Sequence, residues 1–219
     1  MKRKDTIINT YFRFESIIVL VLLWGCSSST PHNKTGFLPT IPKKTLRSGD
    51  IVFRQGSGLT SRIVQTADKN GIYSHVGIVL RDKNGDYMVV HAVPGEPDFK
   101  GDVDRVKLEH IDNFFGNGKA ICGAVMRVNV DSAKAARAAT YALNIFQQNT
   151  LFDHQYDLSD TTQMYCTELV YFVYKKEGVT LADTEKTLVI PIINKKCLLP
   201  GDLLEGNHLS ILTQFQCSN

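Results

Sequence analysis

One cysteine and two histidines have the residue types and the sequence surroundings that nucleophilic catalysis needs. Cys166 stands in "YCTELVYFVYKK", directly before an apolar stripe with helical spacing, His75 opens the run "SHVGIVL", and His91 lies in "MVVHAV". A cysteine attacks a carbonyl carbon when a base handles its proton and a third group orients that base. The three residues therefore indicate a nucleophile, a base and an orienting group, in that order.

The element that would position Cys166 is an amphipathic helix. It follows a polar stretch in which Asp160, Thr161 or Thr162 could cap its start, and Gly178 suits its end. Backbone N–H groups and the partial positive charge at a helix start favour a thiolate over a thiol. The apolar stripe would hold this helix against a sheet, which predicts a rigid support for a reactive sulfur.

The elements that would position the histidines are two neighbouring strands. The runs "SHVGIVLRD" and "DYMVVHAVP" are joined by Asn84-Gly85, a strong hairpin signal. Pairing in that hairpin makes His91 a neighbour of the strand that carries His75, so His91 could orient the His75 ring. Glu96 follows shortly afterwards and is a carboxylate that could substitute in this third role.

The rest of the chain is rich in strands first and helical later. Residues 49–56, 102–110 and 122–130 read as strands, whereas residues 57–68, 132–148 and a short segment after Pro200 read as helices. Ser57 or Ser61 could cap the first helix. Gln55 and Ser57, in the turn after the first strand, could form a rim of the site, and Tyr165 could line it. A backbone N–H at the start of the cysteine helix, that of Cys166, could donate to an oxyanion.

The N-terminal segment predicts export. Basic residues precede an apolar run of eight, residues 17–24, which is too short for a membrane span of about 20 residues. The stretch "LLWGCSSST" resembles the lipobox of bacterial lipoproteins, with Cys26 as the acylated residue. We therefore expect a lipoprotein signal peptide (1–25), a flexible tether (26–45) and one folded domain (46–219). No acidic residue directly follows Cys26, which favours the periplasmic face of the cell envelope.

Charge and cysteine content limit the functional classes that the sequence allows. Four of the 25 basic and two of the 22 acidic residues fall within residues 1–25, so the rest carries a charge of about +1 and shows no nucleic-acid footprint. Cys122 lies in an apolar run and reads as a small buried hydrophobe, while Cys197 and Cys217 could form a disulfide. No clustered spacing indicates a metal site, and no cofactor is expected.

Four motifs, in chain order, resemble one known group. "LRSGDIVFRQGSGLTSRIV", "YSHVGIVL", "VVHAVPGE" and "YCTELVYFVY" look like the YiiX/YebB-like group of the NlpC/P60 cysteine hydrolase superfamily, over residues 46 to 205. That group is circularly permuted, so its histidine precedes its cysteine. The resemblance implies an α+β, papain-like fold in which an antiparallel sheet or partial barrel packs against the cysteine helix. It also places the nucleophile on Cys166, the base on His75 and the third polar residue on His91.

The chemistry that this resemblance implies is attack by Cys166 on a carbonyl, giving a thioacyl-enzyme that water hydrolyses. An exported enzyme of this group would meet peptide amide bonds of the cell wall. Lipid acyl hydrolases or acyltransferases of the same permuted branch are the alternative, with a lipid amide or ester as substrate. A non-catalytic binding module on the same scaffold is a third reading, and it predicts loss of the nucleophile or base.

Overall fold

The computed structural model describes residues 40–215 except 69–70, 117, 185–186, 188 and 191–194. The expected signal peptide, Cys26, most of the expected tether and Cys217 lie outside the described residues. Within the described part of the chain, no helix is both long enough and apolar enough to cross a membrane. Residues 40–45, the end of the expected tether, contact the domain: Ile41 packs on its core and Lys43 forms an ion pair with Asp112.

A six-stranded antiparallel sheet forms the centre of the domain, in the order β4-β3-β2-β1-β5-β8. Its strands are β1 (Ile51–Gln55), β2 (His75–Arg81), β3 (Tyr87–Ala92), β4 (Val106–His110), β5 (Cys122–Val128) and β8 (Leu209–Phe215). A separate pair, β6 (Val189–Ile190) and β7 (Lys195–Lys196), forms a small second sheet. The central strands are buried on both faces, which explains their nearly continuous apolar sequences.

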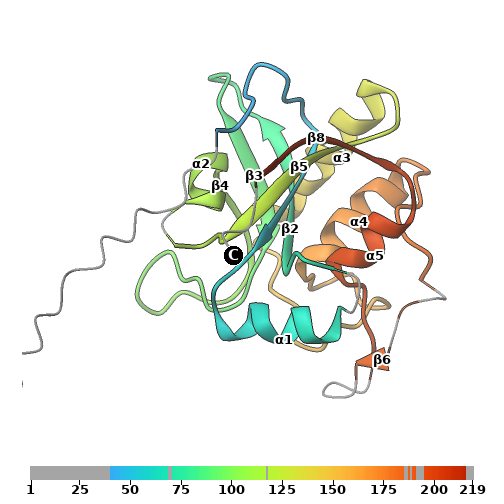
Figure 1. Cartoon of the computed structure of the whole chain (residues 1–219). Helices are drawn as coiled ribbons and strands as arrows, with labels where there is room; N and C mark the ends of the chain where they lie inside the picture. The colour runs from blue at the N-terminus through green and yellow to red at the C-terminus, as the bar shows by residue number, and fades with distance from the viewer. Residues whose placement is uncertain are drawn as a thin grey trace, which may run out of the picture. The chain divides into compact units, whose positions relative to one another are not determined.

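The helices lie around this sheet (Figure 1). They are α1 (Leu59–Ala67), α2 (Ile111–Phe115), α3 (Ser132–Gln147), α4 (Cys166–Lys176) and α5 (Pro200–Glu205). α3 and α4 pack on each other and on β2, and their apolar residues join the larger core cluster. α2 supplies Phe114 and Phe115 to a smaller core cluster that also contains Val52 and Val79. The α+β class with an antiparallel sheet against the cysteine helix is confirmed.

Most of the predicted elements are present, and the differences have local causes. α2, β8 and the two-residue strands β6 and β7 were not predicted. α2 has only five residues, too few to show a helical period, and β8 alternates weakly because it is an edge strand with much of its surface exposed. The predicted caps of α1, Ser57 or Ser61, are also wrong, because the helix begins after Gly58 and has no side-chain cap.

Candidate active site

The start of α4 fixes Cys166 in place. Cys166 is the first residue of the helix and Tyr165 is its N-cap, so the proposed caps Asp160, Thr161 and Thr162 lie too early in the preceding loop. The Tyr165 backbone N–H instead donates to the Glu168 carboxylate (3.3 Å). Burial raises the pKa of Glu168 to about 8, and this carboxyl is packed under the helix start. The half-buried Cys166 thiol is thereby held at a rigid end of the helix.

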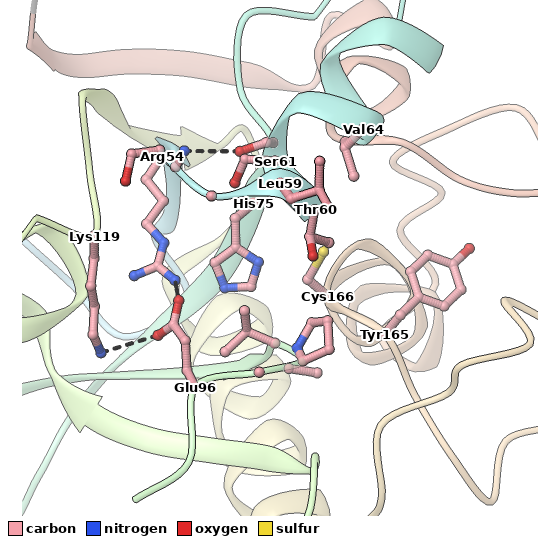
Figure 2. Close-up of a pocket in the computed structure, with 18 of the residues that line it drawn as sticks. Arg54, Leu59, Thr60, Ser61, Val64, His75, Glu96, Lys119, Tyr165 and Cys166 are labelled. Atoms are coloured by element: carbon pink, nitrogen blue, oxygen red, sulfur yellow. Dashed lines mark hydrogen bonds and ion pairs between the residues drawn. The ribbon is translucent and has the colours of Figure 1, made fainter. Parts of the chain in front are cut away.

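Cys166 and His75 line the same cavity, which has a volume of about 430 Å³. Figure 2 shows a ring nitrogen of His75 turned toward the Cys166 sulfur, with the two side chains coming from β2 and α4. The expected convergence of the strand start and the helix start is therefore present. Ser57, Thr60 and Leu59 at the start of α1 form another wall of the cavity.

A chain of buried polar groups continues behind His75. The His75 Nε2 lies 2.9 Å from the His91 Nδ1, at hydrogen-bond distance, and the His91 Nε2 lies 3.0 Å from the Glu109 Oε1. Because the His75 Nε2 faces His91, the nitrogen left for the thiol is Nδ1. The ring of Phe114 stacks on His75 and meets His91 edge-on, with centroids 5.5 and 5.3 Å away. Contact with the Phe114 ring therefore restricts the orientation of both imidazole rings.

Glu96 does not take the orienting role that the sequence left open for it. Its carboxylate pairs with the buried Arg54 and, at 3.2 Å, with Lys119 (Figure 2). Arg54 also donates to the Phe114 carbonyl (2.8 Å), which links this ion pair to the aromatic wall of the site. Among the described residues, the group within hydrogen-bond reach of the His75 Nε2 is His91, as the hairpin predicted.

The charge states of the site follow from burial. Burial lowers the pKa of His75 well below 6.5, and the nearby positive charges of Arg54 and Lys119 lower it further. Burial also raises the pKa of Cys166, although the Thr167 hydroxyl and the Val76 backbone N–H offset part of that effect. Burial thus disfavours both the thiolate that the helix start was expected to favour and an imidazolium at His75. The thiolate at the helix start stays a prediction.

The two residues expected to line the site behave differently. Tyr165 is buried and lines the cavity, and its hydroxyl accepts a hydrogen bond from the Leu198 N–H (3.0 Å). Gln55 does not line this cavity; its Oε1 lies 3.1 Å from the Cys122 sulfur instead. Strand alternation explains the difference, because the neighbouring Arg54 points to the cavity and Gln55 to the opposite side.

The other cysteines are buried or lie outside the described residues. Cys197 is a free buried thiol, and Cys217, the partner that the sequence left open for it, lies outside the described residues. Cys122 is fully buried, as predicted, but it is disulfide-bonded and so is more than a small packing residue. Within the described ranges, no group of three or more His, Cys, Asp or Glu side chains is arranged to hold a metal ion.

Sequence reasoning missed Glu109 as part of this site. Glu109 lies on β4, whose pairing sets Lys107 opposite His91 and Glu109 opposite Val89, so both side chains face the His91 side of the sheet. Alternation along "VKLEH" was visible in the sequence. The missing information was that β4 pairs with β3, which no local pattern gives.

Comparisons with known proteins agree with this geometry. The model of a family described as "Permuted papain-like amidase enzyme, YaeF/YiiX, C92 family" matches residues 45–212. Among solved structures, the chain is similar to a protein described as metalloprotein YiiX from Escherichia coli O157:H7, with a TM-score of 0.60 and 18% identity. That similarity covers 77% of this chain and 97% of the other, and at this identity it shows the fold. No curated protein matches the chain.

Proposed function

This chain belongs to the C92 family of permuted papain-like amidases and is a cysteine hydrolase, and on that premise we propose that Cys166 hydrolyses an amide bond through a thioacyl-enzyme. The observation that carries the proposal is the shared cavity in which Cys166 meets His75, with the His75 Nε2 2.9 Å from His91. These positions support the roles of nucleophile for Cys166, base for His75 and orienting group for His91.

The reaction starts from a neutral pair. As the Cys166 sulfur attacks the carbonyl carbon, its proton moves to the His75 Nδ1, and the imidazolium that forms is stabilised through His91. His75 then gives the proton to the leaving amine, and water attacks the thioester with His75 again as base. The Cys166 backbone N–H, at the first position of α4, has no i−4 partner within the helix and is proposed as an oxyanion donor.

The proposed substrates are peptide amides of the cell wall, and the proposed location is the periplasmic side of the envelope. The leader sequence and the lipobox-like "LLWGC" support this location, with Cys26 as the lipid anchor. The NlpC/P60-like motifs support the peptide substrate. The cavity offers both charge, from Arg54, Glu96 and Lys119, and apolar walls that include Leu59 and Phe152, and a short peptide presents both kinds of group.

The test is hydrolysis by the full chain of a panel of wall peptides and, in parallel, of acyl lipids carrying amide or ester bonds. We expect release of an amine from wall peptides, and a loss of at least about 10³-fold in Cys166→Ala, in line with removal of a covalent nucleophile. Cys197→Ala is the matched control, because Cys197 is the other free thiol of the described chain, and it should keep its rate.

Two results would count against the proposal. Cleavage confined to acyl lipids would move the substrate class to lipids while keeping the nucleophile. Equal rates in wild type and Cys166→Ala, on every substrate of the panel, would remove the catalytic role and favour a binding module on this scaffold.

A further inference from the structure

The buried polar chain behind Cys166 ends on a carboxylate, Glu109. Its Oε1 lies 3.0 Å from the His91 Nε2, and its Oε2 accepts a hydrogen bond from Lys119 (2.7 Å). The Oε1 and the His91 Nε2 are both buried, and neither makes a hydrogen bond of regular geometry among the described residues, so each is the nearest polar group that the other has, at ion-pair distance. Lys119 thus occupies one carboxylate oxygen and turns the other toward His91.

We propose that Glu109 is a positioning residue that fixes the tautomers of both His91 and His75, and so leaves the His75 Nδ1 unprotonated to receive the Cys166 proton. This inference deepens the proposed function, because it rests on His75 acting as the base for Cys166. It concerns a residue that touches neither the substrate nor the sulfur, and that acts through His91.

The tautomers follow from counting hydrogens along the chain. An ionised carboxylate only accepts hydrogen bonds, so the His91 Nε2 that faces it must carry the hydrogen. A neutral imidazole carries one hydrogen, which leaves the His91 Nδ1 as an acceptor. The His75 Nε2, 2.9 Å away, must then be the donor, and the second nitrogen of His75 is bare. That bare Nδ1 is the base that the thiol needs.

The electrostatics of the cluster agree with these states. Burial opposes ionisation of Glu109, but the contacts with His91 and Lys119 outweigh it and lower the pKa of Glu109 to about 2. Burial lowers the pKa of His91 although Glu109 raises it, so His91 is neutral and its tautomer is free to be set. The other charged groups that face this pair are Arg54 from β1, Lys107 from β4, opposite His91, and Glu96 and Lys119 from loops.

The arrangement also explains how a histidine can hold the third position. A neutral imidazole orients a neighbouring ring but stabilises an imidazolium less than a carboxylate does. When His75 is protonated, its Nε2–H still donates to His91, and the His91 Nε2–H still faces Glu109, so no further proton has to move. Glu109 thus supplies the stabilising negative charge indirectly, through His91.

The direct test is the ring-nitrogen NMR spectrum of the full chain with ¹⁵N-labelled histidine, which distinguishes the two neutral tautomers. We expect His75 and His91 of the wild type both to carry their hydrogen on Nε2. Glu109→Gln keeps the shape but can also donate, so we expect it to produce a mixture of tautomers at both rings. Glu109→Asp, an acceptor only, should restore the wild-type tautomers in part.

The matched control is Glu96→Gln. It removes the other carboxylate that pairs with Lys119 without touching His91, so it should leave both tautomers as they are. An Nδ1–H tautomer of His75 in the wild type would overturn the inference, and this reading does not depend on any variant folding. Unchanged tautomers in Glu109→Gln, or the same change in Glu96→Gln, would overturn it as well.

Kinetics separate this inference from the proposed function. On an amide that the wild type cleaves, Glu109→Gln should lower kcat by about 10²-fold, the lower end of what general acid–base catalysis contributes, with KM changed less than about twofold. If the wild type cleaves in a Cys166-dependent way and Glu109→Gln is equally fast, the positioning role is contradicted but the proposed function is not. A wild type with the expected tautomers and no hydrolysis contradicts the proposed function alone.

Discussion

At the scale of residues, burial is the factor that sets the chemistry of the site. His75 and His91 are almost completely enclosed, and Phe114 covers one side of each ring. Low polarity disfavours both a thiolate at Cys166 and an imidazolium at His75, so in the proposed mechanism the proton transfers as the thiol attacks. The helix start contributes donors near the sulfur, and these donors offset part of the effect of burial on the pKa of Cys166.

This charge assignment predicts an unusual pH dependence of kcat/KM. His75 must be unprotonated to accept the thiol proton, and its pKa lies well below 6.5. The rate therefore falls only as the pH drops through that lowered pKa, and stays level up to the raised pKa of Cys166, above 9.0. The measurement is kcat/KM of the full chain across this pH range. An acid limb centred at or above 6.5 would show that His75 is not the buried neutral base described here.

At the scale of elements, the β2–β3 hairpin and the start of α4 determine whether the site exists. Gly77, two residues after His75 on β2, pairs with His91 on β3. A Cβ at Gly77 would come within 2.5 Å of a Val89 methyl carbon and 3.1 Å of the His91 Cβ. The absence of a side chain at this position therefore lets the two histidines approach each other.

We predict that Gly77→Ala displaces His91 and lowers kcat by at least about tenfold, together with a loss of about 1–3 kcal/mol in the free energy of unfolding from overpacking. Gly123→Ala is the matched control, because its Cβ would meet the Phe53 carbonyl oxygen at 2.5 Å and the Phe115 ring, away from His91. Both variants should unfold at lower denaturant concentration. Activity per folded molecule should fall only in Gly77→Ala, and an equal fall in both would contradict the argument.

Sequence patterns predicted the elements that carry Cys166, His75 and His91 because each element has a strong local period. The hairpin turn at Asn84-Gly85 predicted that the strands carrying the two histidines are neighbours. Gly85 adopts a positive φ of 91° in that turn. The patterns did not reveal Glu109, since its role depends on β4 pairing with β3 and on Lys119 arriving from a loop before β5. They also did not reveal that burial raises the pKa of Cys166, because burial of a helix start is a tertiary property.

At the scale of the whole molecule, the predicted N-terminal leader lies outside the described domain. The family match begins at residue 45, close to the predicted domain start at residue 46. The predicted anchor, Cys26, is separated from that start by the expected tether. A lipidated Cys26 would keep the enzyme at a membrane surface without a membrane-spanning helix, since acyl chains contribute about 0.8 kcal/mol per buried methylene.

We predict that Cys26→Ser moves the protein from the membrane fraction to the soluble fraction of bacterial cells that express the full chain. The same variant should lose incorporation of a radiolabelled fatty acid. Cys197→Ser is the control for a general effect of cysteine loss and should remain in the membrane fraction. Label that persists in Cys26→Ser would show that the lipobox-like motif is not the site of acylation.

The measurement that tests the central claim most directly is the mass of the acyl-enzyme. The full chain is mixed with p-nitrophenyl acetate, quenched in acid within seconds, and analysed by intact and peptide mass spectrometry. The account predicts one acetyl group, located on Cys166, which is absent in Cys166→Ala and forms more slowly in His75→Ala. An acetyl group located mainly on Cys197 or on a lysine, or equal acetylation of wild type and Cys166→Ala, would contradict it.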